Sequence, residues 1–261
     1  MANAPRKTRP GKTGTAGAGP AKAATQVLAL PARVRPARFV MRWLLRGGLA
    51  LAGLFGLLVL LYSVVNPPTT IYMMQESRRL GGVQQEWVPA DDIAPVMLRS
   101  AVASEDANFC LHWGFDMAAI RIAVEKGGTR GASTISQQVV KNVFLWHGRN
   151  WGRKAAEAVI TPVMELVWSK RRILEVYLNV AEFGEGIFGV EAAAQHYFGV
   201  SAAKLTPVQA ARLAAVLPDP KRRDAANPTA FVRQRAAAAR DGAETIRRDG
   251  RAACFERPAE D

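Results

Sequence analysis

An uncharged apolar run near the N-terminus constrains this chain more than any other feature. Residues 47–65 contain 19 consecutive positions without a charged side chain. As a helix they would be roughly 28 Å long, close to the ~30 Å hydrocarbon core of a membrane. Trp43 and Tyr62 stand near the ends of the run, where interfacial aromatics are common. A core helix would be polar on one face, so we expect residues 43–65 to be a transmembrane signal anchor.

Positive charge is concentrated before this run. Residues 1–46 contain ten Lys or Arg and no acid, so they contribute +10 of the net charge of +13. Basic residues that flank a span stay in the cytoplasm, which predicts a cytoplasmic N-terminus and a C-terminal domain beyond the membrane. Residues 1–42 are expected to be a basic, disordered tail. A cleaved signal peptide is the alternative, although its basic region would be unusually long.

The rest of the chain is nearly balanced in charge. The high isoelectric point is therefore caused mainly by the N-terminal tail, and no nucleic acid partner is expected. Cys110 and Cys254 are far apart in the sequence. They can pair in an oxidising compartment, but the sequence alone does not bring their Cα atoms within bonding distance. Their pairing therefore stays open.

Helical periodicity dominates the chain after the span. Residues 66–90 are expected to be a linker with a short extended segment, and residues 91–250 a helical domain. Thr134 and Gln137 match the capping box that opens a helix. No run of alternating strand residues appears, so the fold class is expected to be mainly α.

The spacing of apolar residues predicts which helix faces are buried. Asp91 or Asp92 can cap a helix that continues to Ser104, and this helix would place Glu105 on its apolar face, in line with Leu98. Two later helices are expected to carry apolar stripes. The stripes are Val159, Val163 and Val167 in one helix, and Ile173, Leu174, Tyr177 and Leu178 in the next.

Glu105 is the first candidate for chemistry. Burial disfavours the charged form of a carboxyl group and raises its pKa, which suits a general acid or base near neutral pH. The competing interpretation is a structural ion pair with a nearby arginine. The three histidines lack the spacing of metal ligands, so no protein-ligated metal is expected.

A group of basic and amide residues forms the second candidate. Ser133 precedes a helix whose backbone N–H groups favour an anion. Lys154 and Glu157 are three apart and therefore neighbours on one helix, so a simple ion pair is the competing interpretation. The full group is Ser133, Gln137, Gln138, Lys141, Arg149, Arg153, Lys154 and Glu157.

The order of these residues resembles the peptidoglycan glycosyltransferases. Glu-Asp-x-x-Phe-x-x-His-x-Gly stands at 105–114, and Gly-x-Ser-Thr-Ile-x-Gln-Gln-x-x-Lys-Asn at 131–142. Arg-Lys-x-x-Glu is found at 153–157, and Lys-x-x-Ile-Leu-Glu-x-Tyr-Leu-Asn at 170–179. A further match lies at 189–199. Ser136, where threonine is usual, is a mild departure. The resemblance is closest to the monofunctional biosynthetic transglycosylases, which are related to the glycosyltransferase module of class A penicillin-binding proteins.

The resemblance implies a lysozyme-like α domain on one transmembrane helix, facing the periplasm from the bacterial inner membrane. It implies that lipid II is polymerised into glycan strands by β-1,4 bond formation with inversion and release of undecaprenyl diphosphate. Glu105 and Glu157 would be catalytic. The substrate-binding residues would be Asp106, Ser133, Gln137, Gln138, Lys141, Arg149, Arg153 and Lys154.

The resemblance implies no tightly bound cofactor, although a divalent cation (Mg²⁺ or Mn²⁺) can accompany the diphosphate. The expected partners are lipid II, lipid-linked glycan and the membrane. Partners among the cell-division or cell-wall synthesis proteins stay open. Two other function classes also remain: a lytic murein hydrolase, which would not need the basic residues, and a non-catalytic membrane scaffold of the division machinery.

Overall fold

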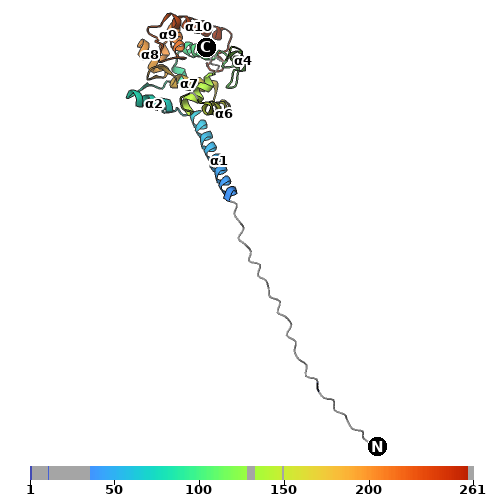
Figure 1. Cartoon of the computed structure of the whole chain (residues 1–261). Coiled ribbons are helices and arrows are strands. Elements are labelled where there is room, and N and C mark those ends of the chain that lie inside the picture. The colour runs from blue at the N-terminus through green and yellow to red at the C-terminus, as the bar shows by residue number, and fades with distance from the viewer. Residues whose placement is uncertain (2–10, 12–35, 128–132, 149, 258–261) are drawn as a thin grey trace. The chain divides into compact units, whose positions relative to one another are not determined.

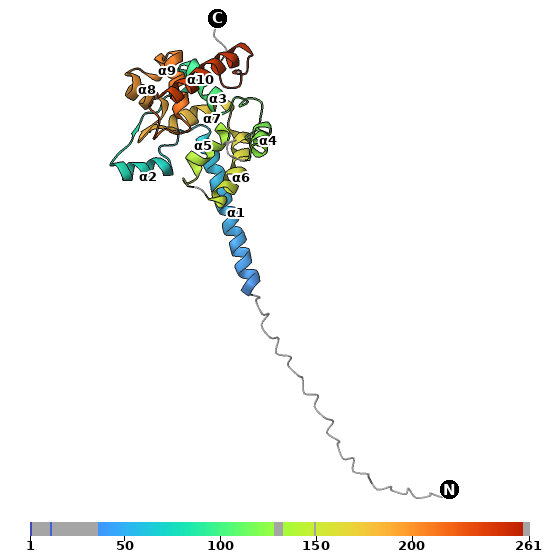
Figure 2. The ribbon, with the colours of Figure 1, turned by 45° about the horizontal axis from the view of Figure 1, so that its top comes forward.

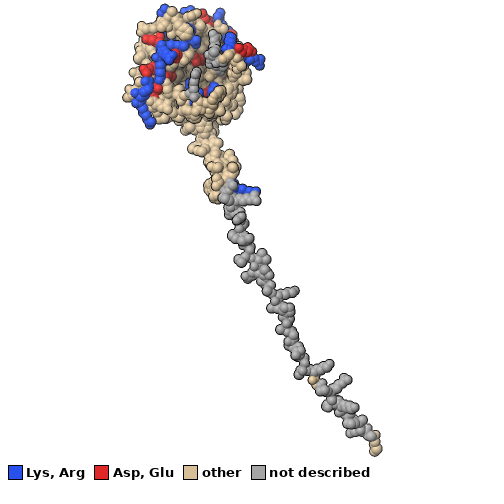
Figure 3. Space-filling view, viewed as in Figure 1, with Lys and Arg blue, Asp and Glu red and all other residues tan. Residues whose placement is uncertain are grey.

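The computed structural model describes residues 1, 11, 36–127, 133–148 and 150–257. The chain divides into two units, residues 1–50 and 51–261. Helix α1 (Pro36–Tyr62) begins in the first unit. Its segment Arg38–Tyr62 has a mean hydropathy of 2.1 and is long and apolar enough to cross a membrane. In Figure 3 most of α1 is uncharged.

Three helices of the second unit pack against one another. They are α3 (Pro95–Glu105), α9 (Pro207–Val216) and α10 (Ala230–Arg248). Their contact faces are rich in alanine, which lets the backbones approach closely. A Cβ on Gly242 of α10 would lie 2.9 Å from Cβ of Ala103 on α3, so any larger residue there would push the two helices apart. Figure 1 shows α9 beside α10, and the contacts of both helices with α3 hold the C-terminal end of α3 in place.

A second group of helices packs around α5. It consists of α5 (Ile135–Phe144), α6 (Trp151–Val167) and α7 (Lys170–Val180). The predicted stripe of α7 is confirmed, because Ile173, Leu174, Tyr177 and Leu178 are all buried. Figure 2 shows α5 beside α6. Helix α4 (Met117–Glu125) precedes them in the chain.

Short elements complete the second unit. Strands β1 (Gln84–Gln85), β2 (Glu182–Gly184) and β3 (Ile187–Phe188) form a small sheet in the order β1-β3-β2. β1 is parallel to β3, and β2 is antiparallel to it. The remaining elements are α2 (Ile71–Leu80), η1 (Ala90–Asp92), α8 (Val190–Phe198) and η2 (Ala202–Lys204). The expectation of a mainly α fold is confirmed.

Two sequence-based expectations about the segments before Glu105 were wrong in detail. The segment 66–90 holds helix α2 and is not only a linker; Thr70 caps that helix by accepting from the N–H of Met73. Helix α3 starts at Pro95 with Ala94 as its N-cap. Asp91 therefore does not cap it, and instead pairs with Arg171.

The apolar stripe predicted for α6 is exposed. Val159, Val163 and Val167 are 68%, 41% and 38% exposed, whereas Glu157 and Thr161 are buried. Periodicity predicted the helix correctly, but the valine face that it predicted to be buried is the exposed one. The buried face mixes polar and apolar side chains, namely Glu157, Thr161, Met164 and Glu165, and the valine face is left exposed.

The C-terminal segment is linked to the loop after α3 by a disulfide and a hydrogen bond. Cys110 and Cys254 form a disulfide with a Cα–Cα distance of 5.7 Å, which answers the question the sequence left open. Arg251 donates through Nη1 to the carbonyl oxygen of Ala107 at 2.9 Å. The conformation of the residues after Glu105 therefore depends on contacts with the end of the chain.

The last turns of α1 are bound to the helical domain. Trp168 donates through Nε1 to the carbonyl oxygen of Val59 at 2.8 Å. Arg172 donates to the carbonyl oxygens of Tyr62 and Val65 at 3.1 and 2.9 Å. The carbonyl of Tyr62 ends α1 and lacks an intrahelical partner, so the guanidinium caps the helix and holds its last turn against α7.

Candidate active site

Glu105 is the last residue of α3 and is half-buried. Its Oε2 accepts a hydrogen bond from Nε2 of Gln138 at 2.9 Å. Burial raises the pKa of the Glu105 carboxyl, while the Gln138 bond and the charges of Arg235 and Lys141 act in the opposite direction. A carboxyl placed between these influences is suited to accept a proton near neutral pH.

Asp106 holds the turn after α3 against the start of α5. It is only 6% exposed. Its Oδ1 lies 2.8 Å from Nε2 of His112, and its Oδ2 accepts from the backbone N–H of Ile135 at 3.0 Å. Both carboxylate oxygens are engaged, so these contacts favour a positioning role for Asp106 over a substrate contact.

The predicted capping box at the start of α5 is confirmed. Oγ1 of Thr134 accepts from the N–H of Gln137 at 3.2 Å, and Oε1 of Gln137 accepts from the N–H of Thr134 at 3.1 Å. Thr134 also donates to the carbonyl oxygen of Gly114 at 2.7 Å. The side-chain oxygen of Gln137 is thus taken up by the cap, and this residue is 5% exposed.

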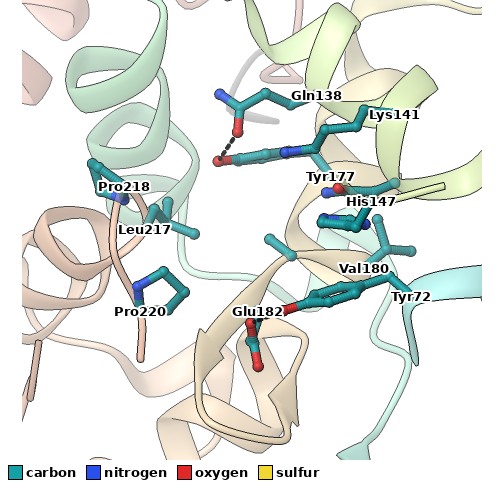
Figure 4. Close-up of a pocket in the computed structure, with 12 residues that line it drawn as sticks. Tyr72, Gln138, Lys141, His147, Tyr177, Val180, Glu182, Leu217, Pro218 and Pro220 are labelled. Atoms are coloured by element: carbon teal, nitrogen blue, oxygen red, sulfur yellow. Dashed lines mark hydrogen bonds between the residues drawn. The ribbon is translucent and has the colours of Figure 1, made fainter. Parts of the chain in front are cut away.

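Gln138 and Lys141 reach the site from the next turns of α5. The hydroxyl of Tyr177 donates to Oε1 of Gln138 at 3.4 Å (Figure 4). Gln138 thus links Tyr177 to Glu105. Lys141 makes no hydrogen bond or ion pair with the residues that the structure describes. Burial lowers the pKa of its ammonium group, and the charge of Glu157 raises it. An anion entering here would favour the charged form and oppose the effect of burial.

Glu157 lies on the buried face of α6 and is 3% exposed. Arg153 donates through Nη1 to its Oε2 at 2.7 Å, and Lys154 pairs with its Oε1. The i,i+3 ion pair expected from the sequence is therefore present. Nζ of Lys154 also lies 3.5 Å from Oγ of Ser133, which brings the starts of α5 and α6 together.

The carboxylates of Glu105 and Glu157 both act on the charge of the same lysine, Lys141. The pKa of Lys141 is raised by Glu157 and by Glu105, and lowered by Arg153 and Lys154. The sequence-predicted residues on α3, α5 and α6 are thus brought together. Arg149 lies outside the described residues.

A cavity of about 190 Å³ opens beside Lys141. Figure 4 shows Gln138, Lys141 and Tyr177 along one wall. The ring of Tyr72 stacks on that of His147 at 3.6 Å, and burial with nearby cations lowers the pKa of His147 to about 4. The rest of the lining includes Glu182, Leu217, Pro218 and Pro220. The cavity therefore combines polar groups with an apolar wall.

Comparison with known proteins places this arrangement in a family. The family model described as "Transglycosylase" matches residues 73–243. The chain belongs to this family. A biosynthetic peptidoglycan transglycosylase of Jannaschia sp. (strain CCS1) is 65% identical over 219 residues, which are 84% of this chain and 92% of that protein.

More distant relatives carry the same name. The biosynthetic peptidoglycan transglycosylase of Rhodospirillum centenum is 48% identical over 228 residues, covering 84% of this chain and 99% of that protein. The one from Caulobacter vibrioides is 48% identical over 200 residues, covering 75% and 87%. The resemblance inferred from the sequence motifs is confirmed.

The family match begins at Met73. In this transglycosylase the matched region thus includes most of α2, which lies before the domain start expected at residue 91. Tyr72, at the start of that helix, donates from its hydroxyl to Oε2 of Glu182 at 2.7 Å. The segment expected to be a linker supplies a wall of the cavity.

Several residues near Glu105 were missed or assigned only to the core. Tyr177 was placed in an apolar stripe, which is correct, but its hydroxyl also reaches Gln138. Arg223 and Arg235 act on Glu105 through their charges. They stand in an Ala- and Arg-rich segment whose sequence gives no reason to single out two of its arginines.

Proposed function

We propose that this transglycosylase polymerises lipid II into glycan strands, joining two lipid-linked substrates at the cleft beside Glu105. The observation that carries the proposal is the pairing of a half-buried carboxyl of raised pKa with the lysines and arginine of α5 and α6. A sugar transfer with a diphosphate leaving group needs a base and positive charge, and both are present.

Glu105 removes the proton from the 4-hydroxyl of the acceptor's N-acetylglucosamine. The oxygen attacks C1 of the donor's N-acetylmuramic acid from the face opposite the diphosphate. A β-1,4 bond forms as the bond from C1 to the diphosphate oxygen breaks, so the configuration inverts. The leaving group departs as undecaprenyl diphosphate, and the proton remains on Glu105 until solvent removes it.

The basic residues stabilise the departing diphosphate. Lys154 is 43% exposed at its side chain and can turn toward a substrate, while Arg153 is held more tightly. Lys141 has no counter-ion of its own within hydrogen-bonding distance among the described residues, and bound diphosphate provides one. Glu157 holds Arg153 and Lys154 in position, so its catalytic contribution is to orient the cations.

The described residues do not fit a protein-held metal ion. They contain no group of three or more His, Cys, Asp or Glu side chains suited to bind one. Both oxygens of Glu157 are engaged by Arg153 and Lys154. No step is therefore assigned to a metal. Mg²⁺ or Mn²⁺ bound by the diphosphate oxygens would enter as part of the substrate, which titration of activity with EDTA tests.

The enzyme works at the outer face of the inner membrane, with its N-terminus in the cytoplasm. The basic tail before α1 supports this orientation, and the Cys110–Cys254 disulfide suits the oxidising periplasm. The exposed apolar residues of α6 suit contact with lipid at the interface. Labelling of single cysteines placed at either end of α1 in intact cells tests the orientation.

The decisive experiment is incubation of the full-length protein with labelled lipid II. We expect a ladder of glycan products on a gel, and its loss in Glu105→Gln. Intact sacculi provide the matched negative test, because a lytic hydrolase would release muropeptides from them. A protein that releases muropeptides and makes no polymer would contradict the proposal; a protein that does neither would support a scaffold.

A further inference from the structure

Polar side chains join helix α2 to two other segments of the domain. Of the ten residues of this helix, Met73 and Glu76 are the ones that are buried. A helix this short depends on contacts with its surroundings for its stability. The contacts that α2 makes with the β2–β3 turn and with the loop after α9 therefore help to decide where its side chains lie.

Glu182, at the start of β2, is the point where these segments meet. Its side chain is 7% exposed. Oε2 accepts from the hydroxyl of Tyr72 at 2.7 Å, and Oε1 accepts from the N–H of Gly186 at 3.2 Å. Nζ of Lys221, in the loop after α9, lies 3.9 Å from Oε1. One carboxylate thus joins α2, the β2–β3 turn and the loop after α9.

A second carboxylate, that of Glu76, extends these connections along α2. Its Oε1 lies 3.0 Å from Nζ of Lys221, and its Oε2 accepts from Nε of Arg79 at 3.0 Å. Arg79 also donates through Nη2 to Oε1 of Glu185 at 2.7 Å. The first turn of α2 is thus held through Tyr72, and its last turn through Arg79.

Tyr72 is the residue of α2 that lines the cavity beside Lys141. Its ring stacks on that of His147 at 3.6 Å and meets Phe188 edge to face at 5.6 Å. Figure 4 shows its hydroxyl directed toward Glu182. His147 and Glu182 line the same cavity. Because the ring of Tyr72 forms part of this lining, the bond that holds its hydroxyl also sets the shape of the cavity.

We propose that Glu182 is a positioning residue that holds Tyr72 against His147 and so shapes the substrate cavity beside Lys141. The inference rests on the proposed function, because the ligand is the lipid-linked sugar diphosphate of that reaction. Its diphosphate would pair with Lys141, and its sugar would pack on the wall that Tyr72 and His147 form. The family match starts one residue after Tyr72, and Glu182 lies between two of the sequence motifs. The motifs alone therefore do not reveal this pair.

Steady-state kinetics with lipid II test the role through Tyr72→Phe, Glu182→Ala and the double variant. Each single variant should raise KM about three- to tenfold, the range for one hydrogen bond. The value of kcat should change less than about twofold, because Glu105 and the basic residues are untouched. The double variant should raise KM no further than the larger single change, since both remove the same bond. Glu182→Gln keeps an oxygen that can accept from Tyr72 and should recover most of the parent KM.

Tyr197→Phe is the matched control. Tyr197 donates to the carbonyl oxygen of Phe183, next to Glu182, at 3.1 Å and lies outside the cavity lining. Loss of that hydroxyl should leave KM at the parent value. A parent KM in Tyr72→Phe, or an equal rise of KM in Tyr72→Phe and Tyr197→Phe, would overturn the proposal and leave Glu182 as a support of the fold. Tyr72→Phe keeps the ring and every charge, so this outcome does not depend on whether Glu182→Ala folds.

The titration of His147 gives a measurement that does not need polymerisation. Burial, together with nearby cations, lowers the pKa of His147 from 6.5 to about 4. Displacement of Tyr72 would expose the imidazole to water and raise its pKa toward the ordinary value. NMR titration of full-length, histidine-labelled protein in detergent should show this rise in Glu182→Ala and not in Tyr197→Phe, with His147→Gln to assign the signal.

The two measurements separate the positioning role from the proposed function. A raised pKa of His147 in Glu182→Ala, in a protein that makes no polymer from lipid II, would support the positioning of Tyr72 and reject the proposed function. An unchanged pKa of His147 in Glu182→Ala would overturn the positioning role, whether or not the protein polymerises lipid II.

Discussion

Glu105 and Glu157 are two glutamates of one site in opposite environments. Glu105 is half-buried and accepts a hydrogen bond from the neutral amide of Gln138. Glu157 is 3% exposed and is bonded directly by two cations. The first can gain and lose a proton, and the second is fixed as a counter-ion. In the proposed mechanism this difference corresponds to proton transfer by Glu105 and the positioning of cations by Glu157.

The two environments are also built from different parts of the chain. The partners of Glu157 are Arg153 and Lys154, one turn away on the same helix. Glu105 depends on Gln138, which is 33 positions away, and on Arg235 from the C-terminal helix. A local cluster survives small shifts between helices, whereas the surroundings of Glu105 require the whole domain to be assembled.

Replacement of the base should have the largest effect. Glu105→Gln should lower kcat/KM by about 10² to 10⁴-fold, the usual contribution of a general base. The fold should persist. Folding raises the pKa of Glu105, so its stabilising contribution is present at low pH and is lost as the pH rises through the folded-state value. At neutral pH the variant should unfold at the parent temperature or above it.

The matched change at the other glutamate should affect both activity and stability. Glu157→Gln leaves Arg153 and Lys154 without their carboxylate, so we expect a lower unfolding temperature together with a smaller loss of kcat/KM than for Glu105→Gln. Calorimetry and the polymerisation assay on the same samples separate the two outcomes. A larger activity loss in Glu157→Gln than in Glu105→Gln would reverse the assignment of roles.

Removal of the disulfide should weaken the Glu105 side of the site selectively. Cys110→Ser with Cys254→Ser frees the segment that holds the loop after Glu105. We expect a loss of about 2–5 kcal/mol in the free energy of unfolding, measured by urea titration. The parent treated with reductant should behave like the double variant. Unfolding midpoints that coincide for the oxidised and reduced parent would contradict this expectation.

The surroundings of Glu157, and other features built from residues close together in the chain, could be predicted from the sequence. The Lys154–Glu157 neighbours follow from helical spacing, and the Thr134–Gln137 capping box from a four-residue pattern. The apolar run of α1 and the mainly α fold follow from composition and periodicity. Each of these features is determined by residues that are close together in the sequence.

The surroundings of Glu105, which come from distant parts of the chain, could not be predicted from the sequence. Nothing near residue 235 marks that arginine as a neighbour of Glu105, because three helices must pack before the two approach. The reversed faces of α6 have a related cause: Val159, Val163 and Val167 are apolar yet exposed, and helical periodicity identifies an apolar face without identifying what covers it. The cysteine pairing likewise depends on where the chain end lies.

Loss of Lys154, which we propose binds the phosphate, should have an intermediate effect. Lys154→Ala should cost at least ~1.5 kcal/mol of transition-state stabilisation, about tenfold in kcat/KM. Lys204→Ala removes the same group from an exposed position on η2 and serves as the control. A kcat/KM equal to that of Lys204→Ala would remove Lys154 from the phosphate site and leave it as a structural partner of Glu157.

The smallest effect should come from the hydroxyl of Tyr177. It donates to Oε1 of Gln138, which turns the Gln138 amide so that its Nε2 faces Glu105. In Tyr177→Phe the amide can turn over and present its oxygen to the carboxylate. Because the bond from Gln138 lowers the pKa of Glu105, its loss should raise that pKa.

The pH–rate profile measures this change. The acid limb of kcat/KM should move to higher pH in Tyr177→Phe, with a loss of about 0.5–1.5 kcal/mol where the limb is steepest and little change at alkaline pH. Tyr197→Phe removes a hydroxyl bonded to the carbonyl oxygen of Phe183 and should leave the limb in place. If the two variants shift the limb equally, the amide of Gln138 is held by other contacts and the long-range support of Glu105 is broader than this single chain of hydrogen bonds.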